Sequence, residues 1–226
     1  SRDICVQGDA TKCIKFFMRR VEMLLYFKVK PILVFDGGFL PMKQKTEIQR
    51  EKQRTSALEE ALKLEKEVNH NGSRDAFIKA VDISPELVAE LLVRVRKLGV
   101  DFVVAPYEAD AQIAYLCRNG IADFALSEDS DCIPFGCKAM FCKMDNEGFG
   151  QYVDMSELKS CKHDFTNFTH GMLLDMCILS GCDYLDSVKG ILLLPLPAAV
   201  FFACSFFGFL FFFFLRIFYG FLCFTL

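Results

Sequence analysis

The chain has 226 residues, with 26 Lys and Arg against 29 Asp and Glu, and a formal net charge of −3. This length is enough for one sizeable α/β core or two small ones. The charge balance excludes a uniformly basic nucleic-acid binder, but a local basic surface offset by an acidic metal site remains compatible with it. Eleven cysteines without a C-x-x-C pair indicate buried free thiols in a reducing compartment rather than a zinc site.

The first half of the chain alternates between predicted helices and a short apolar strand. Residues 9–27 have apolar positions at helical spacing, and 30–35 form an apolar run typical of a strand buried on both faces. Residues 42–66 have helical propensity but are polar nearly all round. An amphipathic helix over 84–98 opens with an N-cap serine and a first-turn proline.

The second half of the chain continues this alternation. We predict strands over 100–104 and 121–127, a helix over 107–118, a hairpin around 146–148 and an apolar helix over 169–180. Strands that alternate with helices predict an α/β fold with a mainly parallel central sheet and helices on both faces. In such sheets the functional site lies off the carboxyl ends of the strands.

Six acidic residues follow predicted buried elements at the points where those elements end. They are Asp36 after the first strand, Glu108 and Asp110 after the second, Asp129 and Asp131 after the third, and Asp183 after the last helix. Two such charges about 4 Å apart repel by roughly 4 kcal/mol at an effective dielectric near 20. The cluster therefore predicts divalent cations or protonated acids, and all-oxygen ligands favour Mg²⁺ or Mn²⁺. Two such ions can catalyse phosphodiester hydrolysis.

Taken singly, each acid also has an ordinary interpretation. Asp36 stands before two glycines and fits a turn, and Glu108 fits a helix cap. Asp129 and Asp131 fit a solvated loop, and Asp183 fits the position after a helix end. Their common position at the ends of buried elements favours the metal site over these alternatives.

The composition changes sharply near residue 190. Residues 191–226 contain a single charge, Arg216, and residues 198–215 form an uncharged stretch long enough for a transmembrane helix. The stretch has no flanking basic cluster and no belt of Trp and Tyr. Three interpretations stay open: a gene-model artefact from a pyrimidine-rich intron, a membrane anchor, and a core helix.

Several long motifs resemble the flap endonuclease superfamily, the XPG-type structure-specific 5′ nucleases. They are PILVFDGG followed by LPMK, VAPYEADAQIAYL, SEDSDCIPFG and ILSGCDYL. Asp110 and Cys182, together with the stretch FGCKAMFCKMDNEGFG, are similar to the exonuclease 1 branch of that superfamily. The resemblance covers roughly residues 8–191 and implies a PIN-like 5′ nuclease fold.

This resemblance implies 5′→3′ exonuclease activity on duplex DNA, 5′ flap cleavage, and a nuclear role in mismatch repair and recombination. The implied substrate is DNA with 5′ ends, nicks, gaps or flaps, and mismatch-repair proteins are implied partners. The implied cofactors are two Mg²⁺ ions, with Mn²⁺ as a substitute. The family's metal ligands match Asp36, Glu108 and Asp110 for the first ion and Asp129, Asp131 and Asp183 for the second.

The polar helix corresponds to the family's helical arch, which we place at residues 41–67. Lys43 and Arg50 are seven residues apart and share one helix face, and they match the arch residues that clamp the scissile phosphate. By pattern alone, a solvated charged helix with i,i+4 ion pairs is the favoured interpretation. The catalytic roles of Lys43 and Arg50 are thus implied by the resemblance.

Residues 169–190 resemble the start of the family's helix-two-turn-helix, which grips duplex DNA and holds a potassium ion. The implied potassium ligands are Ser180, Ser187 and Ile191. The sequence then departs from the family, because LLLPLPAAVFF stands where a second glycine and a basic helix are expected.

The chain also departs from the family at its start. Residues 1–7 match neither the Met-Gly-Ile start nor the first strand that carries a further metal-binding Asp. We therefore assign residues 1–190 to a 5′ nuclease domain without its N-terminal strand and 191–226 to a Phe-rich tail. We expect lower activity than in a complete homologue. The alternatives are a flap endonuclease or junction-resolving relative, and an inactive DNA-binding or membrane-tethered fragment.

Overall fold

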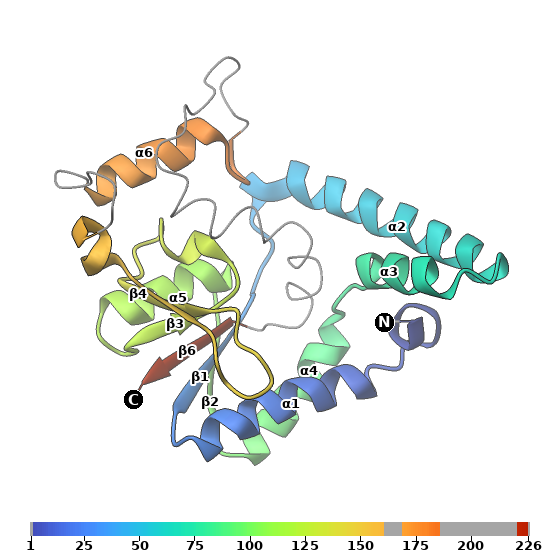
Figure 1. Ribbon diagram of the computed structural model, residues 1–226, viewed down its shortest axis with the longest axis horizontal. Helices are drawn as coiled ribbons and strands as arrows, with labels where there is room; N and C mark the ends of the chain where they lie inside the picture. The colour runs from blue at the N-terminus through green and yellow to red at the C-terminus, as the bar shows by residue number, and fades with distance from the viewer. Residues whose placement is uncertain (1, 161–168, 186–220, 226) are drawn as a thin grey trace.

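The computed structural model describes residues 2–160, 169–185 and 221–225, and shows a twisted sheet with helices on both faces and a long helical arm (Figure 1). The helices are α1 (Thr11–Tyr26), α2 (Gln44–Lys66), α3 (His70–Ala80), α4 (Pro85–Lys97), α5 (Ala109–Arg118) and α6 (His170–Ser180). The strands are β1 (Lys30–Phe35), β2 (Asp101–Val104), β3 (Phe124–Leu126), β4 (Ala139–Cys142), β5 (Gln151–Asp154) and β6 (Phe221–Thr225). Short helical turns cover Asp3–Gln7, Pro41–Lys43, Ser130–Cys132 and Met155–Ser160.

The strands form one six-stranded sheet in the order β2-β1-β6-β3-β4-β5. Strand β1 pairs with β2 in parallel, and β3 pairs with β4 in parallel. Since β6 is antiparallel to both β1 and β3, strands β1 to β4 all point the same way. The mainly parallel α/β sheet predicted from the sequence is confirmed, with β5 and β6 as its antiparallel members.

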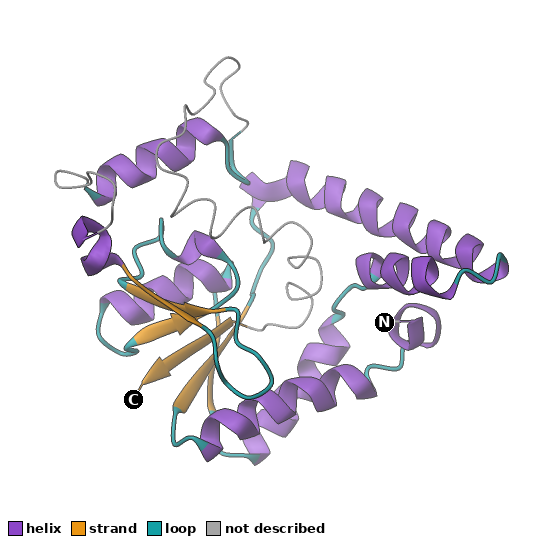
Figure 2. Ribbon diagram, viewed as in Figure 1, coloured by secondary structure: helices purple, strands orange, loops and turns teal. Residues whose placement is uncertain are grey.

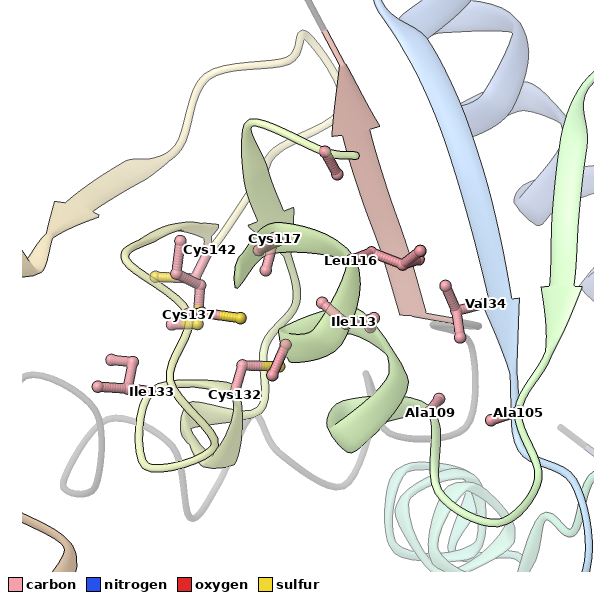
Figure 3. Close-up of a cluster of buried hydrophobic side chains, with 14 of the residues drawn as sticks. Val34, Ala105, Ala109, Ile113, Leu116, Cys117, Cys132, Ile133, Cys137 and Cys142 are labelled. Carbon is pink, nitrogen blue, oxygen red and sulfur yellow. The ribbon is translucent and has the colours of Figure 1, made fainter. Parts of the chain in front are cut away.

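Each face of the sheet has its own hydrophobic core, and the side chains of β1 alternate between the two. Leu33 and Phe35 pack against α1 and α4 through residues such as Val21 and Val95. Val34 faces the other way, into the cluster around Ile113 of α5 (Figure 3). This alternation explains why the apolar run over 30–35 has no polar face.

The same cluster contains several cysteine side chains. Cys117, Cys132, Cys137 and Cys142 lie in it, and all four are buried (Figure 3). These four are free thiols, and so are Cys5, Cys13, Cys177 and Cys182, as the sequence predicts. The four buried cysteines of the cluster act as small apolar side chains.

The helical arm is built from two helices that pack side by side (Figure 2). Helix α2 has 23 residues, which corresponds to a length of about 35 Å. Its predicted helical structure is confirmed, but it is not solvated on every side, because Ala57 and Ala61 are buried. Ala61 packs against Phe77 of α3, a helix that our sequence analysis did not predict.

The position of β6 differs from our expectation for the C-terminal residues. The change in composition predicts that the whole of 191–226 is a tail outside the nuclease domain, yet Phe221–Thr225 forms a central strand of the sheet. The five residues pair with β1 over five positions and with β3 over three. Without these residues, β1 and β3 would each have unpaired backbone groups along one side. Pairing with an extended apolar segment satisfies these groups and therefore stabilises the sheet.

Residues 186–220, which include most of the Phe-rich tail, lie outside the described residues. The uncharged segment over 198–215 and its possible role as an anchor therefore have no structural counterpart here. Among the helices of the described ranges, none combines the length and the apolar character that a membrane span requires.

Deleting residues 221–226 is expected to destabilise the protein strongly. The deletion removes β6 and its hydrogen bonds to two neighbours, each worth about 1 kcal/mol in net stability. Urea unfolding should show a clearly lower midpoint, whereas removal of Leu226 alone should leave it unchanged. Equal midpoints for the six-residue deletion and the intact chain would contradict the central position of β6.

Candidate active site

The loops that follow β1 and β2 approach each other closely and hold Asp36 in place. The Gly37 backbone N–H donates to the Tyr107 carbonyl at 2.6 Å. A Cβ on Gly37 would lie only 1.7 Å from the Ala105 oxygen, so only glycine fits there. The Asp36 carboxylate accepts a 2.8 Å hydrogen bond from the Ala109 N–H at the start of α5.

Asp110, on the first turn of α5, lies near the acids that follow β3. It is only 7% exposed, and the Cys132 thiol donates to its Oδ1 at 3.4 Å. Burial, followed by the charge of Asp129, raises the pKa of Asp110 to about 8, and Asp131 and Asp36 add to the effect. The Asp129 side chain also accepts from the Asp131 N–H at 3.1 Å, which fixes the turn that carries both residues.

Glu108 and Asp183 lie next to the start of α2 and pair with its basic residues. Lys43 is buried and forms ion pairs with Glu108 and with Asp183, whose Oδ2 is 3.1 Å from Nζ. Arg50 reaches the same Asp183 oxygen at 2.7 Å. Burial works against the charged lysine, but the hydrogen bonds to Glu108 and Asp183 outweigh it and raise the pKa of Lys43.

A tight turn after α6 presents Asp183 to these partners. The backbone groups of Cys182 and Leu185 hydrogen-bond to each other in both directions, at 2.9 and 3.2 Å. Asp183 and Tyr184 are the two central residues of this turn. The Thr46 hydroxyl on α2 donates to the Asp183 carbonyl at 3.1 Å, so α2 is tied to the turn by backbone as well as side-chain contacts.

The structure brings the eight site residues predicted from the sequence into two neighbouring groups. Asp36, Asp110, Asp129 and Asp131 form an acidic group at the carboxyl ends of β1 to β3. Lys43, Arg50, Glu108 and Asp183 form an ionic group between α2 and α6. The two groups are linked through the start of α5, because Glu108 is the N-cap residue of this helix and Asp110 lies in its first turn.

The donor chemistry of the acidic group fits a hard divalent cation, since carboxylate oxygens are the ligands that Mg²⁺ prefers. Burial raises the pKa of Asp110 most, and the charges of the neighbouring acids add a repulsion that a cation would relieve. Within the described ranges, no three acidic, histidine or cysteine side chains converge closely enough to hold a metal ion. Glu108 and Asp183 are instead neutralised by Lys43 and Arg50.

Only one of the residues suggested as potassium ligands can be located. The Ser180 hydroxyl donates to the Met176 carbonyl at 2.6 Å, inside the last turn of α6. Ser187 and Ile191 lie outside the described residues.

Two residues of the site were not singled out by sequence reasoning. Tyr184 donates from its hydroxyl to Glu108, and Cys132 contacts Asp110. The only sequence signal for either was proximity, because Tyr184 follows Asp183 and Cys132 follows Asp131. Neither residue type has a periodic pattern that would distinguish it from an ordinary core residue.

Comparison with known proteins places these elements in one family. Two family models match the chain: the XPG N-terminal domain over residues 3–57 and the XPG I-region over residues 99–183. The chain is 46% identical to exonuclease 1 of Oryza sativa subsp. japonica over 188 residues, which is 83% of this chain and 22% of the relative. It is 44% identical to exonuclease 1 of Danio rerio over 186 residues, 82% of this chain and 23% of the relative. The chain thus spans less than a quarter of the length of these two relatives.

Two solved structures share the fold. The catalytic core of Rad2 in complex with a DNA substrate has a TM-score of 0.57 and 24% identity, and the match covers 85% of this chain and 52% of the other. The flap endonuclease-1 of Methanococcus jannaschii has a TM-score of 0.54 and 22% identity, covering 80% and 56%. At these identities the likeness concerns the fold.

Proposed function

Because the chain belongs to the XPG family, we propose that it is a structure-specific 5′ nuclease of the exonuclease 1 type. Its substrate is duplex DNA with a free 5′ end, a nick, a gap or a 5′ flap, and its reaction is phosphodiester hydrolysis that depends on Mg²⁺ or Mn²⁺. We place it in the nucleus, in mismatch repair and recombination alongside mismatch-repair proteins. The nuclease activity is supported by the identity to exonuclease 1 sequences.

One observation carries this proposal more than any other. Asp36, Asp110, Asp129 and Asp131 follow three strands that point the same way, and the charges of the other three acids contribute to the raised pKa of Asp110. Burying such a cluster is unfavourable for folding alone. A phosphodiesterase that works with divalent cations needs this arrangement, since the cations supply Lewis acidity to the phosphate and its leaving oxygen.

The basic residues of the ionic group are suited to binding the phosphate of the substrate. Lys43, just before α2, presents an ammonium group, and Arg50 on α2 presents a guanidinium group; both types bind phosphate oxygens well. In this structure their charges are directed at Glu108 and Asp183. A scissile phosphate entering between α2 and α6 would exchange these contacts for contacts with its own oxygens, which stabilises the negative charge of the transition state.

The experiment that tests the proposal measures release of 5′ nucleotides from a nicked duplex labelled at its 5′ end. Cleavage is expected with Mg²⁺ and not with excess chelator. Asp129→Ala should abolish cleavage while DNA binding, measured by fluorescence anisotropy, stays within about threefold. The matched control is Asp101→Ala, which changes an exposed acid at the amino end of β2, at the opposite edge of the sheet.

Unchanged turnover in Asp129→Ala would remove this residue from the site. An equal loss of cleavage in Asp101→Ala would show that the effect is a general consequence of removing an acidic residue. The proposed activity would be overturned if the intact chain cleaved no duplex with a free 5′ end, a nick, a gap or a 5′ flap.

A further inference from the structure

Tyr184 contacts two residues of the site at once, through different parts of its side chain. Its hydroxyl donates to Oε2 of Glu108, while the other oxygen of Glu108 pairs with Lys43. The Lys43 Nζ in turn lies over the Tyr184 ring, 4.9 Å from the ring centroid. The three side chains therefore form a closed ring of contacts, with one face of the aromatic ring as its base.

The position of Tyr184 is itself well defined by the backbone. It is a central residue of the Cys182–Leu185 turn, which two backbone hydrogen bonds close. The turn follows Gly181, whose φ of 94° is favoured by glycine, and it is linked to α2 through Thr46. Because the backbone of this turn is fixed, the Tyr184 side chain can determine where the side chains that contact it lie.

The direction of the hydrogen bond follows from the chemistry of the two side chains. An ordinary phenol has a pKa of about 10 and so keeps its proton at neutral pH, whereas an ionised carboxylate has only acceptor oxygens. The phenol is thus the donor at neutral pH, and Glu108 accepts as a carboxylate. Such a donor orients the carboxylate without neutralising its charge, as outer partners of metal-ligating groups do.

We propose that Tyr184 is a positioning residue for the nuclease reaction: its hydroxyl sets the orientation of Glu108, and its ring sets the position of Lys43. One side chain thus contacts both the Glu108 carboxylate and the Lys43 ammonium and fixes where this ion pair lies. The role of the two partners in cleavage rests on the proposed function, whereas the two contacts of Tyr184 can be tested without any activity.

The first test is spectroscopic and needs no substrate. The intact chain, labelled with [ζ-¹³C]tyrosine, contains six tyrosines, and the resonance of Tyr184 is the one lost in Tyr184→Phe. Glu108→Gln should shift this resonance, because an amide replaces the carboxylate acceptor. Glu47→Gln, which alters an exposed partner of Arg50, should not shift it. An unshifted Tyr184 resonance in Glu108→Gln would overturn the proposal.

The second test separates the hydroxyl from the ring. Tyr184→Phe should lower kcat about tenfold with KM little changed, the size expected when a partner of a metal-ligating group is removed. Tyr184→Leu should lower kcat further and raise KM, because Lys43 also loses the ring beneath it. Tyr115→Phe, an exposed position on α5, is the matched control and should behave as the unaltered chain.

These two tests fail in distinguishable ways. Equal kcat in Tyr184→Phe and the unaltered chain would overturn the role of the hydroxyl, and identical kinetics for the phenylalanine and leucine variants would overturn the role of the ring. A chain that cleaves no DNA would contradict the proposed function, and the shift of the Tyr184 resonance would then decide the positioning role alone.

Discussion

Replacing Lys43 by methionine is expected to destabilise the folded protein by about 3 kcal/mol at neutral pH, the effect of removing one partner from a buried ion pair. Methionine keeps the length and apolar stem of the lysine but leaves Glu108 and Asp183 without its positive charge. Since pairing raises the pKa of Lys43, its stabilising contribution is complete at pH 7 and is lost only as the pH rises through that raised pKa.

Urea unfolding at pH 7 measures this effect directly. The matched control is Lys52→Met, at an exposed lysine on α2, which should change stability by less than about 0.5 kcal/mol. Combining Lys43→Met with Glu108→Gln should recover part of the loss, because the amide no longer needs a cation. If the two lysine variants were equally stable, the ion pairs of Lys43 would not hold α2 at the site.

The sequence was informative wherever local pattern decides the structure. The run over 30–35 is β1 with the same bounds, and Ser84 with Pro85 marks the start of α4, where the Ser84 hydroxyl caps the Leu87 N–H. The closeness of Asp36, Asp110 and the acids after β3 follows from strand direction alone. Because parallel strands end at one edge, this grouping needs no knowledge of side-chain packing.

Features that depend on contacts between distant segments were not predictable in this way. Helix α3 contains Asn71, Gly72 and Ser73, which are weak helix formers, and it is stabilised by packing against α2. Strand β6 lies in a uniformly apolar stretch without alternation, so only pairing with β1 and β3 reveals it. The tyrosine contact to Glu108 likewise depends on where α6 ends relative to β2.

Replacing Asp110 by asparagine is expected to stabilise the protein near pH 7.5 in the absence of divalent cations. The folded protein holds a proton on Asp110 up to a pKa of about 8, whereas the unfolded chain releases it near the ordinary value of 3.8. Between these values the folded state binds more protons than the unfolded state. Stability therefore falls as the pH rises, by up to about 1.4 kcal/mol per pH unit from this one group.

Asparagine has nearly the same shape and no charge, so the variant should lack this part of the pH dependence. Its free energy of unfolding should match that of the unaltered chain near pH 4 and exceed it increasingly toward pH 8. Unfolding in chelator at a series of pH values measures the difference. The control Asp101→Asn, at the exposed amino end of β2, should show the same dependence of the free energy of unfolding on pH as the unaltered chain.

Although Asp110→Asn should raise stability, it should lower both cleavage and the stabilisation by Mg²⁺. Mg²⁺ should stabilise the unaltered chain by binding its folded state, and this gain should be much smaller in Asp110→Asn. The same substitution should abolish cleavage if Asp110 is a metal ligand. A carboxylate that weakens the fold at neutral pH and is needed for the reaction is the expected compromise at an active site, where stability is exchanged for function. If Asp110→Asn were no more stable at pH 7.5, burial and the neighbouring acids would not raise the pKa of Asp110, and the argument for a cation among these acids would lose its physical basis.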